Sequence, residues 1–408
     1  MTTSIRPARE DDLGRLIEIH GSAYPGSGTY DHQKRDFTHH PLGGLDDVRV
    51  IEKDGRIVGH AVLFTFDLWI GGRRVPSAGL ASVAIASEAR GQGLGRVLLD
   101  GLHEEMASRS VAQSLLYPFR EGYYARLGYA TTAPLVTLRL AASAVVKAAA
   151  RKADPSDEPL EPVTIEGARV AEARALYERV ARGTSGRLAR SEEMWMRLFA
   201  EESRYMIGVA SPQHLEGYVR FFHDVPELHG RQTLVVRDFV PAGPRARRAL
   251  FELLGRQRDQ VDDIELTVPY GDAHAFAFED APGARRGSRL VEHPIGYVGA
   301  GPMVRLVDVA RALASRGYLA DGELVLRHTG ERGAQTLRIV ARDGVAEVAE
   351  THDEPQIEVT TAALASIAAC GIRPSEAAEL GWVQGNSNTV AQAERLFSGP
   401  RFQCLDPF

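Results

Sequence analysis

Residues 83–99 carry the side chains whose types and spacing most directly suggest chemistry. They read as a buried strand, a glycine-rich turn with Arg90 and Arg96, and an amphipathic helix. Such a turn exposes backbone N–H groups, and the positive end of the helix dipole points at the same place. Gly93 and Gly95 lack the Cβ that would hold an anion away from the backbone. The sequence therefore predicts a pyrophosphate site, and a nucleotide or coenzyme that carries it.

Two other phosphate-binding patterns do not fit this turn. A Walker loop ends in Gly-Lys-Ser/Thr, whereas this turn ends in Gly95-Arg96-Val97. A dinucleotide fingerprint needs G-x-G-x-x-G and an acidic residue about 20 positions later, and no clear second parallel strand carries one here. A glycine-rich helix start without a ligand is the competing interpretation, which the apolar strand before the turn disfavours.

The spacing Arg90-x-x-Gly93-x-Gly95 resembles the acyl-CoA loop of the GNAT N-acetyltransferases. This resemblance implies acetyl-CoA as the cosubstrate. It also implies that backbone groups of the preceding strand bind the pantetheine arm and the acyl carbonyl. The expected coenzyme-binding residues are Val83, Ala84, Ile85, Arg90, Gly91, Gln92, Gly93, Leu94, Gly95 and Arg96.

The order of elements that must position this turn divides the chain into units of residues 1–150, 151–300 and 301–408. The first has strands joined by Asp-Gly and Gly-Gly hairpin turns, then the turn and its helix, and a strand at 133–140 that completes the unit. A proline-rich acidic stretch, 154–162, marks a linker. The second unit repeats this order, but its turn after the strand 232–240 contains Pro241 and Pro244, which remove backbone donors. The third unit has strands followed by helices.

The predicted fold class is therefore α+β: tandem GNAT domains, the second degenerate, followed by a domain that resembles the sterol-carrier-protein-like α+β fold. This order, together with motifs at 83–95, 117–129 and 402–408, resembles the Eis (enhanced intracellular survival) family of acetyltransferases. The resemblance implies a homohexamer and direct attack of a primary amine on the thioester through a tetrahedral intermediate. The acceptor would be a small polyamine-like molecule or an aminoglycoside.

A tyrosine is the expected general acid. The segment Tyr124-Ala-Arg126-Leu-Gly128-Tyr129 matches the family's Tyr-x-Arg-Phe/Leu-Gly-Tyr pattern. A phenol with a pKa of about 10 stays protonated at neutral pH and can donate to the thiolate that leaves. We therefore assign the role to Tyr124, and we expect Tyr129 to be a core aromatic residue.

By the same resemblance, Phe408 supplies its free C-terminal carboxylate as the general base. The pKa of an α-carboxyl is about 3.3–3.7, so this group needs partial desolvation or a relaying water to accept a proton efficiently. Phe402, Leu405 and Phe408 are apolar at three-residue spacing, which indicates a tail that is held in place. A frayed terminus is the alternative.

The acceptor amine is expected to bind along the loop 24–45, which offers acids and aromatic rings. The candidates are Tyr24, Tyr30, Asp31, Asp36 and Phe37. The histidines of this loop have no spacing suited to a closed metal site with cysteine, so no metal is predicted.

Composition narrows the class of protein. The 408 residues carry a net charge of −6, with 44% hydrophobic and 25% charged residues, so nothing points to nucleic acid. With only Cys370 and Cys404, no leader-like start and no long apolar run, we expect a cytoplasmic protein that does not enter a membrane. Two other functions stay open: a lysine acetyltransferase for proteins or peptides, and a non-catalytic regulator that binds acyl-CoA or lipid.

Overall fold

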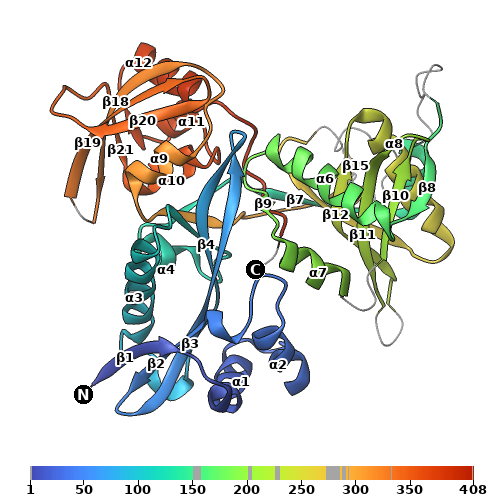
Figure 1. Ribbon diagram of the computed structural model, residues 1–408, viewed down its shortest axis with the longest axis horizontal. Helices are drawn as coiled ribbons and strands as arrows, with labels where there is room; N and C mark the ends of the chain where they lie inside the picture. The colour runs from blue at the N-terminus through green and yellow to red at the C-terminus, as the bar shows by residue number, and fades with distance from the viewer. Residues whose placement is uncertain are drawn as a thin grey trace.

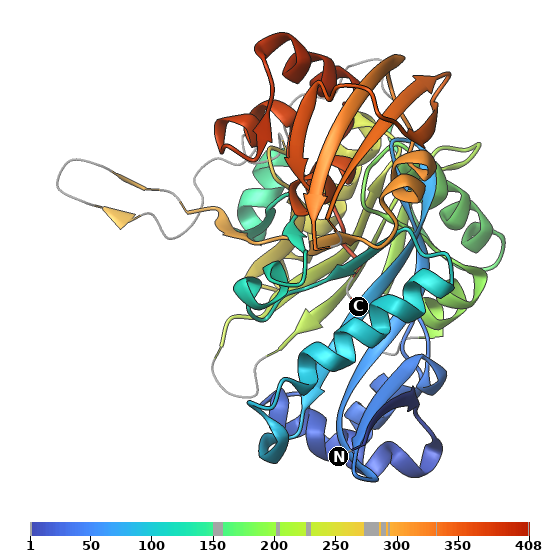
Figure 2. The same cartoon turned by 90° about the vertical axis from the view of Figure 1, so that its left-hand side faces the viewer.

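The computed structural model describes residues 2–149, 158–200, 205–225, 230–272, 285–286, 291–292, 294–331, 333–406 and 408. Three lobes follow one another along the chain, coloured blue to teal, green to yellow, and orange to red in Figure 1. Figures 1 and 2 both place the C-terminus in the middle of the molecule rather than at its edge.

The first lobe is built on an eight-stranded sheet. Seven strands have the order β1-β2-β3-β4-β5-β17-β6, and the eighth, β9, pairs with β3. Two-residue turns with both residues at positive φ join its hairpins, at Asp54-Gly55 and Gly71-Gly72. Figure 2 shows α3 lying across the long β3–β4 hairpin. The strands are β1 (Thr3–Pro7), β2 (Val48–Lys53), β3 (Arg56–Ile70), β4 (Arg73–Ile85), β5 (Gln113–Leu116), β6 (Ala130–Thr131), β9 (Leu188–Ala189) and β17 (Met303–Leu306), and the helices are α1 (Leu13–Ala23), α2 (Tyr30–Thr38), α3 (Leu94–Ser108) and α4 (Glu121–Ala125).

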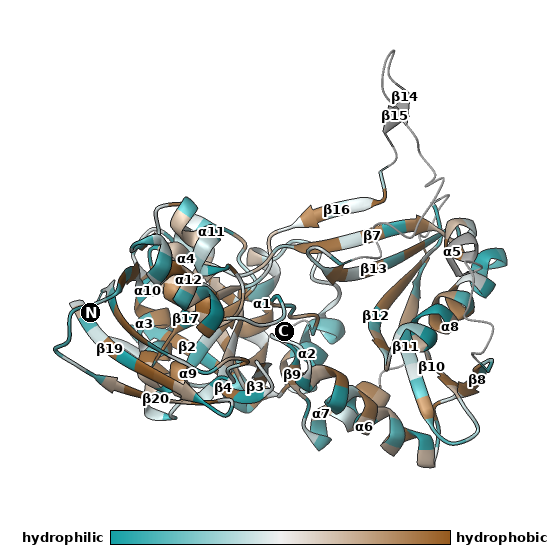
Figure 3. Ribbon diagram, turned by 90° about the horizontal axis from the view of Figure 1, so that it is seen from above, coloured by the Kyte–Doolittle hydropathy of each residue, from teal (hydrophilic) through white to brown (hydrophobic). Residues whose placement is uncertain are grey.

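The second lobe holds a seven-stranded sheet with the order β16-β7-β13-β12-β11-β10-β8. Hydrophobic residues, brown in Figure 3, recur along its strands β7 and β12. The strands are β7 (Leu135–Ala141), β8 (Glu161–Thr164), β10 (Tyr205–Ala210), β11 (Leu215–Asp224), β12 (Thr233–Pro241), β13 (Asp263–Pro269) and β16 (Gly296–Gly299), with the separate pair β14 (Arg285–Arg286) and β15 (Val291–Glu292). The helices are α5 (Ala142–Ala149), α6 (Ala168–Arg182), α7 (Glu192–Ala200) and α8 (Pro244–Gly255).

The third lobe has a five-stranded sheet with the order β20-β19-β18-β21-β22. Its helix α10 is buried along nearly its whole length, because apolar residues occupy all its faces. The strands are β18 (Gly322–Gly330), β19 (Gly333–Arg342), β20 (Val345–Glu350), β21 (Ile357–Thr360) and β22 (Val383–Gln384), and the helices are α9 (Val309–Ser315), α10 (Thr361–Ala368), α11 (Pro374–Glu379) and α12 (Ser387–Leu396).

The lobes exchange strands, and this corrects one expectation. The strand at 133–140 does not complete the first sheet: it forms β7, which pairs with β13 and β16 of the second sheet. The place next to β5 is taken by β17, from residues 303–306, which also pairs with β6. The division of the chain at 150 and 300 stays a prediction about folding units.

The expected linker also differs in part. The alanine-rich residues before it form α5, and residues 161–164 form β8, which pairs with β10. The rest of the expected linker, up to residue 157, lies outside the described residues. No helix formed by the residues that the structure describes is long and apolar enough to cross a membrane.

Candidate active site

A divergence between two parallel strands opens the candidate coenzyme site. β4 and β5 pair in parallel from Ser77 with Gln113 to Leu80 with Leu116, and β4 then continues to Ile85 paired with β3 but no longer with β5. The pairing of β4 with β3 shifts register here, and Ser82 takes a positive φ of 48°. Such a bulge increases local twist and frees backbone groups from the ladder.

A cleft of about 630 Å³ lies at this divergence. One wall is the end of β4, another is the glycine-rich turn with the start of α3, and aromatic rings close a third side. Its lining residues are Ala23, Tyr24, Val83, Ala84, Ile85, Ala89, Arg90, Gly91, Gly93, Leu94, Gly95, Arg96, Phe119 and Tyr123.

The turn has the backbone geometry that an anion needs. Gly91 and Gly93 have φ values of 78° and 77°, which only glycine adopts readily. Gly93 is the N-cap of α3, and no side chain caps the helix. A Cβ on Gly95 would lie 2.8 Å from the hydroxyl of Tyr123. The uncapped helix start therefore offers backbone donors to a phosphate group, and the residues fit a pyrophosphate-bearing coenzyme.

The predicted polar residues of the turn have different surroundings. Arg90 donates from Nε to the carbonyl of Ile85, 3.1 Å away, and stays exposed at the cleft. Arg96 contacts Asp100 and Glu331, the latter from the third lobe. Gln92 does not line the cleft, because its Oε1 accepts a hydrogen bond from Lys53. Nine of the ten predicted coenzyme residues thus line the cleft, and Gln92 is the exception.

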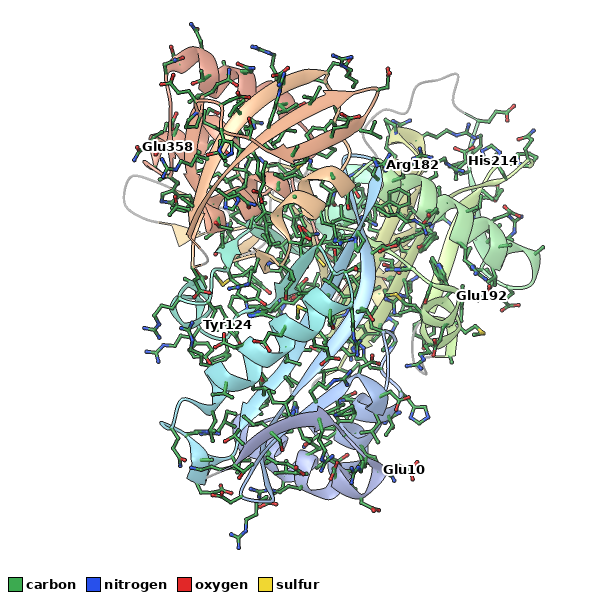
Figure 4. All side chains as sticks on the ribbon, turned by 60° about the vertical axis from the view of Figure 1, so that its left-hand side comes forward. Glu10, Tyr124, Arg182, Glu192, His214 and Glu358 are labelled. Atoms are coloured by element: carbon green, nitrogen blue, oxygen red, sulfur yellow. The ribbon has the colours of Figure 1, made fainter. Side chains whose placement is uncertain are left out.

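Tyr124 lies in an aromatic group beside this cleft and is only 2% exposed. Figure 4 labels it on α4, next to α3. Its ring centroid is 5.1 Å from that of Tyr123 and 5.6 Å from that of Phe119, two residues that line the cleft. Burial raises the pKa of Tyr124 above its usual value, with smaller contributions from Tyr24 and its neighbouring tyrosines. Its phenol therefore keeps its proton throughout the neutral range.

Tyr129 is engaged differently. Its hydroxyl lies 2.7 Å from Ser114 Oγ and 2.9 Å from His103 Nε2, and the side chain is 1% exposed. This network leaves it as a core residue, as expected. The hydroxyl of Tyr124, by contrast, has no hydrogen-bond partner among the described residues.

The C-terminal tail is held by the protein over its whole described length. Phe402 donates its N–H to the carbonyl of Cys370 at 3.0 Å, and Gln403 donates to Ser185 at 2.8 Å. The hydroxyl of Tyr117 donates to the carbonyl of Cys404 at 3.0 Å. Phe402, Cys404 and Asp406 are all buried. The tail therefore follows the two-residue period of an extended segment, not the three-residue spacing noted in the sequence.

Asp406 fixes the end of the tail to the second lobe. Its carboxylate accepts from Arg190 Nε at 3.0 Å and from the hydroxyl of Tyr177 at 3.1 Å. Arg190 also donates to Asp238 at 3.0 Å, and its guanidinium lies 4.0 Å from the ring centroid of Tyr177. Arg190, Asp238 and Asp406 are at most 5% exposed in their side chains.

Phe408 lies against β4 at the place where the strands begin to diverge. Its ring is 5.2 Å from that of Tyr117 and 5.5 Å from that of Phe66. A Cβ on Gly79 would come within 2.7 Å of the Phe408 ring, so any side chain there would displace the ring. Gly79 immediately precedes Leu80, the last residue of β4 that pairs with β5.

The candidate acceptor residues do not gather in one place. Tyr24 lines the coenzyme cleft and donates its hydroxyl to the carbonyl of Val83 at 2.9 Å. Tyr30, Asp31 and Asp36 are exposed on α2. Phe37 is 4% exposed and packs edge-on against His60, so it belongs to the core.

A second cavity, about 450 Å³, lies between the β3–β4 hairpin and the segment 188–194 of the second lobe. It includes Phe66, whose ring contacts Phe408. Asp67 and Ser77 add polar groups, and Leu42 is the one residue that the loop 24–45 contributes. The sequence did not indicate Phe66, Asp67 or Ser77 as site residues, because these positions of β3 and β4 carry no motif.

Sequence reasoning also missed two stacked histidines behind the cleft, one fully buried and one partly buried. His60 is fully buried on β3, and its ring stacks on His20 at 5.7 Å. His20 stacks on Tyr24 at 4.7 Å. The residues that the structure describes contain no group of three His, Cys, Asp or Glu side chains suited to a metal ion.

Comparisons with known families agree with this architecture. Residues 4–132 and 186–306 each match a family described as an acetyltransferase (GNAT) domain, and residues 309–405 match a sterol carrier protein domain. These matches confirm the predicted α+β fold class. In the second GNAT domain, α8 begins with Pro244, so the helix start that would bind a phosphate lacks one backbone donor.

Relatives and solved structures cover most or all of the chain. Proteins named N-acetyltransferase Eis from Mycobacterium tuberculosis and Mycobacterium bovis are 27% identical over 338 residues, 79% of each chain. A GCN5-related N-acetyltransferase from Anabaena variabilis has a TM-score of 0.82 at 22% identity, and Eis1 from Mycobacterium abscessus has a TM-score of 0.75 at 24% identity. Both structural likenesses span 100% of each chain.

Proposed function

We propose that this chain, an N-acetyltransferase with two GNAT domains, transfers an acetyl group from acetyl-CoA to a primary amine. It is homologous to the Eis N-acetyltransferases. GNAT acetyltransferases use acetyl-CoA, and the cleft at 83–96 has the volume, the glycines and the uncapped helix start that such a coenzyme needs. The acceptor is a small polyamine-like molecule or an aminoglycoside, bound in the cavity that contains Phe66 and Asp67.

The reaction uses two proton transfers, one from the attacking nitrogen and one to the departing sulfur. The amine nitrogen attacks the thioester carbonyl carbon and forms a tetrahedral intermediate, whose oxyanion a backbone N–H of the β4 bulge stabilises. The carboxylate of Phe408 accepts the proton that the amine loses. The C–S bond then breaks, and Tyr124 donates its phenolic proton to the departing sulfur. The products are an acetamide and the free thiol of CoA.

One observation carries this proposal: the ring of Phe408 packs on Gly79, beside the point where β4 and β5 part. The coenzyme cleft comes from the first GNAT domain, and the tail is anchored by Arg190 of the second lobe. The carboxylate therefore belongs to a residue that is held next to the reacting end of the cleft. Positioning of this kind contributes a large share of the rate in group transfer.

The test is the steady-state release of CoA thiol with a panel of amines. Tyr124→Phe removes the proton donor and should lower kcat by about 100-fold or more. Adding two glycines after Phe408 converts its carboxylate to an amide and should have an effect at least as large. Tyr123→Phe, which removes a neighbouring hydroxyl from the same cleft, and the same two glycines placed at the N-terminus serve as controls.

Each outcome bears on a different part of the proposal. An unchanged rate of the chemical step in the extended chain would remove Phe408 from the mechanism. Tight binding of acetyl-CoA without turnover of any amine would favour the regulatory function instead. Turnover of lysine-containing peptides in preference to polyamines would favour a macromolecular acceptor.

We also propose a homohexamer in the cytoplasm, by likeness to the Eis proteins. Cys370 and Cys404 are both buried and unpaired, as suits a reducing compartment. Light scattering of the full chain measures the assembly directly, and a monomer at micromolar concentration would contradict this part of the proposal.

A further inference from the structure

The second GNAT domain repeats the strand divergence of the first. β12 and β13 pair in parallel from Thr233 with Asp263 to Val236 with Leu266, and they then separate. Figure 3 shows these two strands within the second sheet. A cavity of about 130 Å³ lies at this point, between Phe239 and Pro241 on one strand and residues 266–269 on the other. Gln403 and Leu405 of the C-terminal tail also line it.

Arg187 contributes a charge to this cavity that the protein does not balance. The residue is 8% exposed, and its Nε is buried without a hydrogen-bond partner. Among the described residues, its guanidinium makes no hydrogen bond and no ion pair. Buried arginine is almost always paired, because desolvation of an unpaired charge is costly.

Two buried carboxylates that lie, like Arg187, around Tyr177 are already engaged. Asp238 accepts from Arg190 and from Arg220, each at 3.0 Å. Asp406 accepts from Arg190 at 3.0 Å. These two aspartates therefore balance Arg190 and Arg220, and neither forms an ion pair with Arg187.

A second guanidinium faces the same space. Arg247, on α8, lines the cavity, and its Nη1 lies 3.9 Å from the carboxylate of Asp272. Burial lowers the pKa of Arg247, Asp272 opposes this, and the charge of Arg187 lowers it further. Among the described residues that line this small cavity, two are arginines and one is an aspartate, and Arg187 is the arginine that forms no ion pair with them.

We propose that this cavity binds a small oxyanion, a carboxylate or a phosphate, between Arg187 and Arg247. Guanidinium forks suit the paired oxygens of either ion. A water needs about 10–15 Å³ of such space, so the cavity holds an ion of several heavy atoms. The anion would lie beside Gln403 and Leu405, in the tail that carries Phe408. This inference goes beyond acetyl transfer and does not depend on it.

The experiment compares thermal unfolding of the full chain in chloride, inorganic phosphate and acetate at matched ionic strength, with titration calorimetry for the dissociation constants. Phosphate or acetate should raise the unfolding temperature of the wild type above that in chloride, and the ion with the lower dissociation constant is the preferred class. Arg187→Met should weaken binding by about tenfold or more. In chloride it should be at least as stable as the wild type, since an unpaired buried charge is gone.

Two further variants keep the test decisive. Arg247→Gln leaves Arg187 in place and should also weaken binding, which covers the case where Arg187→Met does not fold. Arg96→Met alters the coenzyme turn instead and should leave this response intact. The proposal fails if neither ion acts beyond chloride. It also fails if the response persists in both Arg187→Met and Arg247→Gln, or disappears only in Arg96→Met.

Discussion

His60 is a single buried side chain that couples stability to pH. Burial, with a smaller contribution from the neighbouring His20, lowers its pKa to about 3. An unfolded histidine has a pKa of about 6.5, so between these values the unfolded chain binds the extra proton. The contribution of neutral His60 to stability is therefore complete above about pH 6.5 and is lost as the pH falls toward 3.

We predict that this residue adds a slope of up to about 1.4 kcal/mol per pH unit to the free energy of unfolding below pH 6. Urea unfolding at pH 7.5, 6.5 and 5.5 measures the slope. His60→Leu should reduce it by that amount, whereas His32→Leu, on the exposed face of α2, should not. Equal slopes in the wild type and His60→Leu would show that His60 is charged in the folded protein.

At the scale of elements, the C-terminal tail, residues 402–408, is held by the ion pair between Asp406 and Arg190. Asp406 touches no reacting group, so it is a positioning residue that acts through Phe408. Asp406→Asn weakens the ion pair with Arg190 and should lower kcat by about tenfold, because the end of the tail loses its anchor. The KM for acetyl-CoA should not change, since its cleft is built from other elements.

A drop in stability alone could mimic part of this result. Ile339→Val, in the core of the third lobe, is the matched control, since such a change costs about 0.5–1.5 kcal/mol. It should leave kcat unchanged at a temperature where both variants are folded. If Asp406→Asn lowers only the unfolding temperature and not kcat, the residue is structural and not positioning.

Strands and turns could be predicted from the sequence where the signal is local. The turns at Asp54-Gly55 and Gly71-Gly72, and the glycines at 91 and 93, need positive φ, and all of these residues have positive φ in the structure. The partners of β7 and β17 could not be predicted, because strand pairing across more than 120 residues leaves no local pattern. Asp406 was missed for a similar reason. An acidic residue near a terminus is usually exposed to solvent, and its partner Arg190 lies 216 positions away in the sequence.

The exchange of strands makes the two GNAT domains one unit at the scale of the molecule. β7, which directly follows the first GNAT domain in sequence, pairs with β13 of the second sheet. β17, which begins at residue 303, pairs with β5 of the first sheet. β5 is one side of the coenzyme divergence, so the cleft depends on a strand from the end of the second GNAT domain. Met303, Val304 and Leu306 are at most 4% exposed, and their burial stabilises this edge.

A pair of truncated chains tests this dependence. Residues 1–300 lack β17, which leaves β6 unpaired and β5 as an open edge, whereas residues 1–308 restore the strand and its buried side chains. We expect the shorter chain to show no cooperative unfolding transition and no binding of acetyl-CoA, because an unpaired edge at the cleft exposes both apolar surface and backbone groups. The longer chain should regain a transition by near-ultraviolet circular dichroism, although it lacks the third lobe. Identical behaviour of the two fragments would mean that β17 covers a sheet already stable without it, and that the first GNAT domain folds alone.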